Sequence, residues 1–264
     1  MKKFLALMMA SLLLVSLVAC NKTKEEDNTD VKETLPVVSD VLVFENFRYV
    51  VNESGMYEIQ SYIPTSNDLV TVTVPKDIEG RPVTGIGENA FKASKYLKEI
   101  VLPETITYID NYAFYDCDYL TSVTLPKSLK TIGKGAFQDC NALTTVKFSE
   151  ELLTIGEFAF MNCPVLTDVT LPAKLQTVSM MAFYNCDALT DIVIPESTKT
   201  LGDMAFHECT NLATITVPAT TTELGASLFS KCADELTVNT PDGSAFAEYV
   251  ENNRYNVKAP AAVE

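Results

Sequence analysis

Cysteine is the most regularly spaced reactive residue in this sequence. Six cysteines lie 23 residues apart, with Ser94 one period before the first. In an exported protein such a set suggests disulfides, but these need Cα atoms about 4.4–6.8 Å apart and converging Cβ vectors. Residues at one position of a stacked repeat all point the same way, so we expect a column of buried free thiols, with disulfides as the alternative. The column comprises Cys117, Cys140, Cys163, Cys186, Cys209 and Cys232.

The other reactive side chains indicate neither a metal site nor a catalytic centre. The sequence has no C-x-x-C pair, and His207 is the only histidine, whereas zinc sites combine several Cys and His ligands. A Ser or Cys nucleophile normally needs a nearby base. His207 occupies a repeat position that elsewhere holds Tyr115, Gln138 or Tyr184, so we expect it to be incidental and exposed. We predict no enzyme and no cofactor; a carboxylate pair assembled only in space is the alternative.

Five tyrosines in two adjacent repeats form the sharpest candidate for binding. Later repeats have threonine at the Tyr108 position and alanine or valine at the Tyr119 position, so the repeat does not require these rings. Exposed tyrosine offers a large contact area at low entropic cost and is enriched at binding hot spots. We predict a binding site here, with local packing near the N-terminal cap as the alternative. The tyrosines are Tyr96, Tyr108, Tyr112, Tyr115 and Tyr119.

A second candidate surface follows the solvent-facing positions of the repeated strands. It is rich in hydroxyl groups and moderately acidic, and a neighbouring ladder adds Thr121, Thr144, Thr167 and Thr190. Concave faces of solenoids are common binding surfaces. Threonine is also a good strand residue, so a purely structural role is the alternative. The predicted face contains Glu99, Val101, Ser122, Thr124, Thr145, Lys147, Asp168, Thr170, Asp191, Val193, Thr214 and Thr216.

A 23-residue repeat must position all of these side chains. The pair Ala-Phe and its variants recur at this period, and segments such as Leu143–Phe148 alternate as a strand with one buried face does. One unit cannot bury its apolar face alone, so copies must stack. We predict an α/β repeat solenoid, right-handed, whose seven strands form a parallel concave sheet, with short helical turns around Ala136 and Phe137 on the convex side. The repeated phenylalanines are Phe91, Phe114, Phe137, Phe160, Phe183, Phe206 and Phe229.

The N-terminus reads as a targeting segment. Lys2 and Lys3 precede an apolar run from residue 4 to 18, which is short for a transmembrane helix. Leu17-Val18-Ala19-Cys20 resembles a bacterial lipobox, which implies that Cys20 is the lipidated N-terminus. We therefore expect a signal peptide at 1–19 and a lipidated cysteine with a flexible tether at 20–40. An ordinary cleaved signal and an uncleaved anchor are the alternatives.

The repeat pattern C-x-x-L-x-x-V-x-L-P-x-x-L-x-x-I-G-x-x-A-F resembles the BspA-type leucine-rich repeat of bacterial surface antigens. The resemblance covers about residues 42–258. It implies an N-terminal cap and first repeat strand at 41–90, a repeat array at 91–241, and a C-terminal cap helix and tail at 242–264. Known members of the family include adhesins that bind host proteins.

The net charge of −15 indicates which partners to expect. An acidic surface repels phosphate, so nucleic acid is excluded. We expect an exported protein, lipid-anchored to the outer face of a bacterial membrane at the cell surface. Its expected function is non-catalytic binding or adhesion to an extracellular protein or glycan. A structural lipoprotein that organises the envelope is the main alternative, and an enzyme is a remote one.

Overall fold

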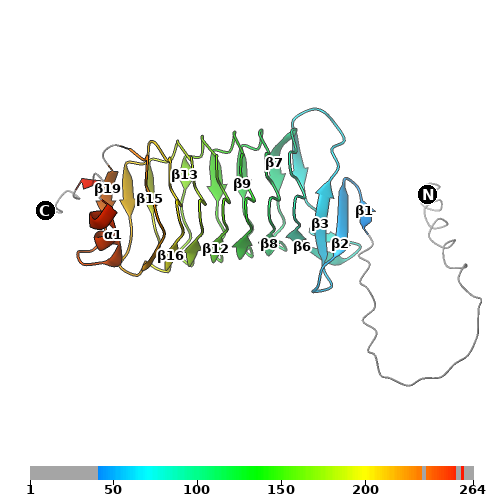
Figure 1. Cartoon of the computed structure of the whole chain (residues 1–264). Coiled ribbons are helices and arrows are strands. Elements are labelled where there is room, and N and C mark those ends of the chain that lie inside the picture. The colour runs from blue at the N-terminus through cyan, green and yellow to red at the C-terminus, as the bar shows by residue number, and fades with distance from the viewer. Residues whose placement is uncertain (1–40, 234–235, 254–256, 259–264) are drawn as a thin grey trace, which may run out of the picture. The chain divides into compact units, whose positions relative to one another are not determined.

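The computed structural model describes residues 41–233, 236–253 and 257–258 (Figure 1). The predicted signal peptide, Cys20 and the tether lie outside the described residues. Within the described part of the chain, no helix is both long and apolar enough to span a membrane.

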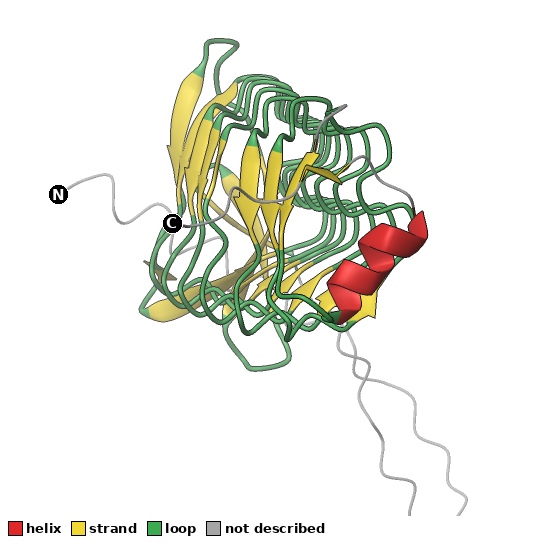
Figure 2. Ribbon diagram, turned by 90° about the vertical axis from the view of Figure 1, so that its left-hand side faces the viewer, coloured by secondary structure: helices red, strands yellow, loops and turns green. Residues whose placement is uncertain are grey.

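From the fourth strand onward the chain winds in stacked coils, and each full coil adds one short strand to each of two sides (Figures 1 and 2). Within the array, partners in neighbouring coils are parallel and 23 residues apart, as in the pairing of Val123 with Val146, whereas the offset differs at its two ends, as in the pairing of Thr71 with Glu99. The predicted parallel solenoid is thereby confirmed. The strands of the first side are β4 (Val70–Thr73), β7 (Leu97–Val101), β9 (Ser122–Thr124), β11 (Thr145–Lys147), β13 (Asp168–Val169), β15 (Asp191–Val193), β17 (Thr214–Thr216), β19 (Leu236–Asn239) and β20 (Val257–Lys258).

The second side carries a parallel sheet that the sequence analysis did not predict. It continues from an antiparallel N-terminal cap, in which β1 pairs with β2 and β2 with β3. The strands are β1 (Leu42–Phe44), β2 (Phe47–Val51), β3 (Tyr57–Tyr62), β5 (Asp77–Ile78), β6 (Arg81–Ile86), β8 (Tyr108–Ile109), β10 (Thr131–Ile132), β12 (Thr154–Ile155), β14 (Thr177–Val178), β16 (Thr200–Leu201) and β18 (Glu223–Leu224).

The turns around each Ala-Phe pair are not helical, so that detail of the prediction was wrong. Each coil has two residues with positive φ here, for example Gly135 at 57° and Asp139 at 60°. The backbone N–H of Phe137 donates to Ala159 O in the next coil at 2.8 Å instead of to its own turn. Alternate N–H groups thus bond to the next coil, while those of Ala136 and Gln138 donate within the turn to the carbonyls of Gly133 and Gly135. Among the described residues the one helix is α1 (Ala245–Asn253), at the predicted C-terminal cap.

The first side is not one continuous sheet, as we had expected, but two. One sheet runs β13-β11-β9-β7-β4 and the other β15-β17-β19-β20, so β13 and β15 are not paired. On either side of this break the threonine column is bonded in register: Thr167 N–H donates to Thr144 O at 3.0 Å, and Ala213 N–H to Thr190 O at 2.8 Å. Across the break, Ala188 N–H donates to Pro164 O at 3.1 Å instead. The sheet therefore opens between two coils that the sequence period makes equivalent.

Stacked phenylalanines form the centre of the core. Consecutive rings from Phe91 to Phe229 have centroids 4.9–5.9 Å apart and are nearly parallel. Tyr62 of the cap stacks on Phe91 at 5.5 Å, and Phe246 of α1 meets Phe229 edge-on at 5.8 Å. Both cap aromatics were missed because they do not fall on the 23-residue period. They cover the ends of a column that a repeat array would otherwise leave exposed.

Candidate functional site

The predicted strand residues do share one solvent-facing surface, which we call the strand face. It consists of the outward side chains of β7, β9, β11, β13, β15 and β17. In β9, buried Val123 lies between exposed Ser122 and Thr124, which is the alternation that places polar residues outward. Thr145, Thr214 and Thr216 are half-buried. The remaining exposed members are Glu99, Val101, Lys147, Asp168, Thr170, Asp191 and Val193.

The threonine ladder beside this face has a structural role. Thr121 Oγ1 donates to Lys98 O at 3.3 Å, and Thr144 Oγ1 donates to Thr121 O at 3.0 Å. Each hydroxyl thus ties its coil to the preceding one. Thr190 differs, because its hydroxyl donates to Asp191 Oδ2 at 2.8 Å. The exception falls at the break between the two sheets.

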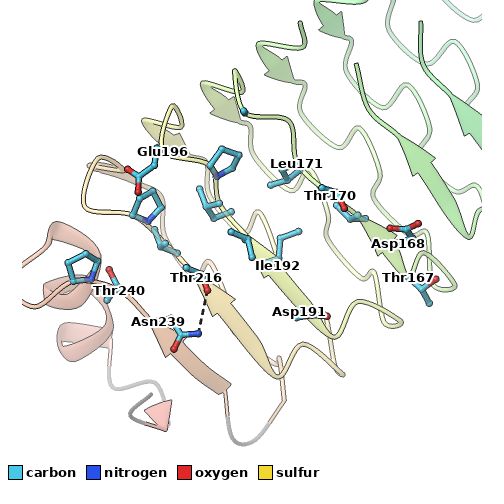
Figure 3. Close-up of a pocket in the computed structure, with 18 residues that line it drawn as sticks. Thr167, Asp168, Thr170, Leu171, Asp191, Ile192, Glu196, Thr216, Asn239 and Thr240 are labelled. Carbon is cyan, nitrogen blue, oxygen red and sulfur yellow. Dashed lines mark hydrogen bonds between the residues drawn. The ribbon is translucent and has the colours of Figure 1, made fainter. Parts of the chain in front are cut away.

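A groove of about 900 Å³ lies on the strand face at this break (Figure 3). Asp168 and Asp191 project from neighbouring strands, and Glu196 lies on the loop beyond β15. Val193 in the groove is an exposed aliphatic residue, with 64% of its surface accessible. The loop residues Glu196, Pro218 and Thr240 also line the groove. They follow the strands and carry no periodic signal of binding, so they were not predicted from the sequence.

The described lining of the groove carries negative charge. Among the described residues, its lining contains the carboxylates of Asp168, Asp191 and Glu196 and no lysine, arginine or histidine. In the part of the chain that the structure describes, none of the three forms an ion pair. Uncompensated carboxylates lining one concave surface raise the local concentration of cations and cationic ligands.

The five tyrosines do not gather into one patch. The rings of Tyr112 and Tyr115 meet edge-on at 6.0 Å, and Lys92 Nζ lies 5.1 Å from the centroid of the Tyr115 ring. Tyr119 is 52% exposed, and Tyr96 is half-buried before β7. The nearby Asp139 carboxylate raises the pKa of Tyr115. The rings of Tyr112, Tyr115 and Tyr119 thus remain at least partly accessible to a ligand. Their binding role stays a prediction.

Tyr108 lies in the second sheet and joins it to the N-terminal cap. Its hydroxyl donates to Glu58 Oε2 and accepts a hydrogen bond from Asn52 Nδ2 at 3.2 Å. Burial, followed by the hydrogen bond to Glu58, raises the pKa of Tyr108. A Cβ at Gly85 would lie 2.1 Å from Cζ of this ring, so the glycine makes room for it. These contacts favour packing at the cap, the alternative reading, for this one tyrosine.

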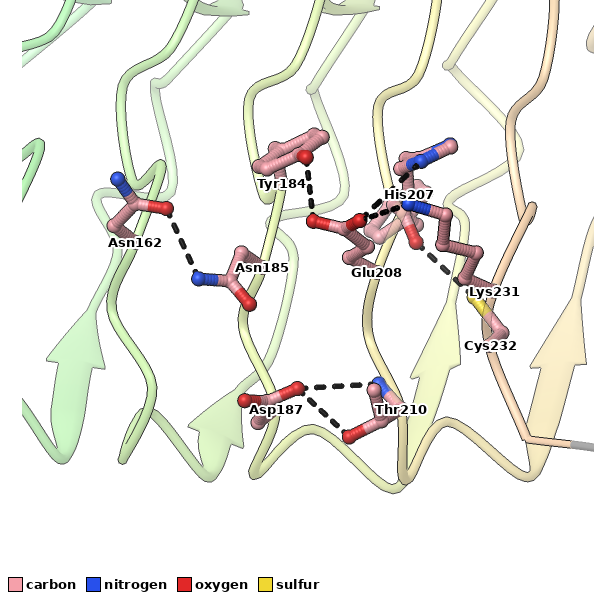
Figure 4. A network of polar contacts seen from close by, with 10 residues as sticks. Asn162, Tyr184, Asn185, Asp187, His207, Glu208, Thr210, Lys231 and Cys232 are labelled. Carbon is pink, nitrogen blue, oxygen red and sulfur yellow. Dashed lines mark hydrogen bonds and ion pairs between the residues drawn. The ribbon is translucent and has the colours of Figure 1, made fainter.

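His207 belongs to a polar network on the turns (Figure 4). Its ring stacks on Tyr184 at 5.3 Å, and its Nε2 lies 3.9 Å from Glu208 Oε1. Glu208 also accepts hydrogen bonds from Lys231 and the Tyr184 hydroxyl, which lower the pKa of its carboxyl. The His207 side chain is 13% exposed, so the expectation of an exposed position was wrong. The stacked ring from the preceding coil covers it.

The repeated cysteines form the expected column of free thiols inside the stacked coils. Five are fully buried and Cys232 is half-buried, and all six are free thiols. Each thiol donates to a phenylalanine carbonyl of the preceding coil at 3.1–3.2 Å, as Cys163 does to Phe137. Burial raises the pKa of Cys117 to about 12 and raises that of Cys163 as well. Since a thiolate is the nucleophilic form, these thiols are held in their unreactive form.

Comparison with known proteins identifies the repeat. The family model described as "BspA type Leucine rich repeat region" matches in six copies over residues 57–190 and 132–253. This chain belongs to the BspA-type leucine-rich-repeat family. No curated protein matches it. Membership of this family is consistent with a protein-interaction or surface module. Solenoids of the family are typically non-catalytic scaffolds.

Two solved structures of bacterial leucine-rich-repeat proteins are similar to this BspA-type chain in fold. The protein from T. pallidum has 24% identity and a TM-score of 0.51, over 82% of this chain and 97% of its own. The protein from Eubacterium ventriosum has 24% identity and a TM-score of 0.58, over 70% of this chain and 50% of its own. At this identity the likeness establishes the fold alone.

Proposed function

We propose that this BspA-type protein is a non-catalytic binding module at the bacterial cell surface, anchored to the outer face of a membrane by lipid on Cys20. It binds an extracellular protein or glycan through the groove on the strand face. The groove of about 900 Å³ is the observation that carries the proposal. The stacked core does not need an aliphatic residue as exposed as Val193. Val193 adds apolar contact area to a concave face of the solenoid, and such faces are the usual binding surfaces of stacked-repeat proteins.

A non-catalytic role is supported by the state of the reactive groups. The column thiols are buried and protonated, and His207 is held by a tyrosine ring and a carboxylate. In the described residues no group of three or more His, Cys, Asp or Glu is placed to hold a metal ion. The groove offers contact area and charge, which are the requirements of binding.

Substituting Val193 with arginine is expected to weaken ligand binding at least tenfold, because the long charged side chain fills the groove. The measurement is binding of the chain from residue 21 onward to an array of extracellular-matrix proteins and glycans, followed by titration of each hit. Val101→Arg is the matched control. Val101 occupies the equivalent position of β7, is 50% exposed and lies outside the groove, so its substitution should change affinity less than twofold.

Three other outcomes are informative. If both arginine variants bind normally and a Tyr115→Ala, Tyr119→Ala double variant does not, the site lies on the tyrosines and the groove assignment is wrong. If both arginine variants and the double variant all bind normally, the groove assignment is also wrong. An array without hits, from protein that circular dichroism shows to be folded, contradicts the binding role and favours a structural one in the envelope.

Cys20→Ser is expected to move the protein from the membrane fraction to the soluble fraction of cells, because residue 20 then lacks the thiol that would carry an acyl chain. Each buried CH₂ contributes about 0.8 kcal/mol to membrane anchoring. Fractionation with incorporation of a labelled fatty acid measures this. Cys232→Ser serves as the control, since it removes a different cysteine. Label retained in the Cys20→Ser protein would refute the anchor.

A further inference from the structure

We infer that the groove receives an extended peptide segment carrying lysine or arginine side chains, presented by a partner protein. This inference rests on the proposed function and narrows the ligand to one chemical class. The charge of the groove is its first support. The three carboxylates of Asp168, Asp191 and Glu196 are exposed, and in the described part of the chain no cationic side chain lines the groove with them. A cationic ligand would therefore supply charges that the fold leaves unpaired.

On the strand face, the acidic stretch ends at Lys147. Lys147 is exposed and occupies the repeat position of Thr170 and Val193, one coil before Thr170. It is outside the groove lining. A cationic ligand thus meets attraction from Asp168 onward and repulsion at Lys147. The ligand is confined to the C-terminal half of the strand face.

The dimensions suit a short stretch of extended chain. The groove is lined from the coil of Asp168 to the coil of Asn239, which is three coil spacings. At about 4.8 Å per spacing, this length is roughly 14 Å. An extended chain rises about 3.3 Å per residue, so four or five residues fill it. Side chains that alternate along such a segment can reach carboxylates on one side and Val193 or the groove prolines on the other.

The lining favours a peptide over a sugar. None of the described lining residues is aromatic, so the groove has no flat ring on which a neutral sugar can stack. Acidic glycans would be repelled by the same carboxylates. Hydroxyl and amide groups such as those of Thr170, Thr216 and Asn239 can instead hydrogen-bond to a peptide backbone. Aliphatic contacts with Val193 add apolar area.

The test titrates two fluorescent octapeptides into the chain from residue 21 onward, which contains every residue that the structure describes. One probe alternates lysine and valine, and the other alternates glutamate and valine. Fluorescence anisotropy at about 0.15 M salt suppresses long-range attraction to the acidic chain. We expect saturable binding of the lysine probe and at least tenfold weaker binding of the glutamate probe.

A neutralised groove supplies the decisive comparison. The variant Asp168→Asn, Asp191→Asn, Glu196→Gln should bind the lysine probe at least tenfold more weakly, equivalent to about 1.4 kcal/mol. The matched control Glu45→Gln, Glu53→Gln, Glu88→Gln makes the same change in net charge at exposed positions away from the groove. It should alter binding less than twofold. A third variant, Lys147→Glu, should strengthen binding about threefold by extending the acidic stretch.

The outcomes separate this inference from the proposed function. Equal weakening in the two triple variants would mean general charge attraction and would overturn the inference. So would equal binding of the two probes, or no binding of the lysine probe to folded protein. In each of these cases, array hits that remain sensitive to Val193→Arg would leave the proposed function standing with another ligand class. Loss of all array hits would remove both.

Discussion

Phe160→Ala is expected to lower the free energy of unfolding by about 4 kcal/mol, within the range known for removing a buried phenylalanine ring. The ring is fully buried and lies 5.3 Å from Phe137 on one side and 5.3 Å from Phe183 on the other. Its loss opens a cavity in the middle of the aromatic column. Both neighbouring coils lose a packing partner, and the coils can collapse little because their backbones are hydrogen-bonded to each other. Urea denaturation followed by circular dichroism measures the change.

Phe158→Ala is the matched control, because it makes the same substitution two residues away. Phe158 is half-buried outside the column and has a φ of 57°. Alanine is strained to the same degree at this positive φ, so the substitution removes only the packing of a half-buried ring. We expect a loss of about 1 kcal/mol. Equal losses at the two positions would show that the column does not dominate the stability of the array.

The second large effect is a loss of stability in alkali. Burial raises the pKa of all five fully buried column thiols, to about 12 for Cys117, whereas a free thiol titrates near 9. Above pH 9 the unfolded chain therefore releases protons that the folded chain retains. Stability from these thiols is fully present below pH 9 and declines as the pH rises toward 12. Each thiol contributes a slope on the order of 1 kcal/mol per pH unit, so five together should unfold the protein within this window.

Tyrosine and lysine titrate in the same range, so the contribution of the thiols is measured as a difference in pH dependence between the protein and a variant. In the triple variant Cys140→Ser, Cys163→Ser, Cys186→Ser, three of the five buried groups can no longer ionise. Serine fits the position, as Ser94 shows in the first repeat. Urea midpoints measured from pH 8 to pH 11 under reducing conditions should fall about half as steeply with pH in this variant. Identical slopes would contradict the assignment of alkaline instability to the thiol column.

The repeat made much of the fold predictable. Because every coil places the same sequence position in the same surroundings, the 23-residue spacing alone identified the phenylalanine and cysteine columns and the parallel strands. The outward positions of β9, β11 and β15 followed from alternation within each strand. The C-terminal helix was expected from the tail and is α1.

The candidate groove could not be found in this way. Its lining includes Asp168 and Asp191, whose strands β13 and β15 do not pair although the two residues occupy equivalent positions of the repeat. Glu196 reaches the groove from a loop, and Tyr108 proved to be tied to Glu58 of the cap. The positions of these residues relative to one another depend on how particular coils pack together, which the repeat pattern does not specify.

The sequence by itself determined the period, the buried columns and the strand face, because stacking repeats one environment. The tertiary structure decided the second sheet, the non-helical turns, the cover over His207, the break between β13 and β15, and the groove. These features depend on hydrogen bonds and ring contacts between coils, such as that from Ala188 N–H to Pro164 O at 3.1 Å. A periodic pattern specifies what every coil shares, whereas contacts that differ from coil to coil arise only in the folded chain.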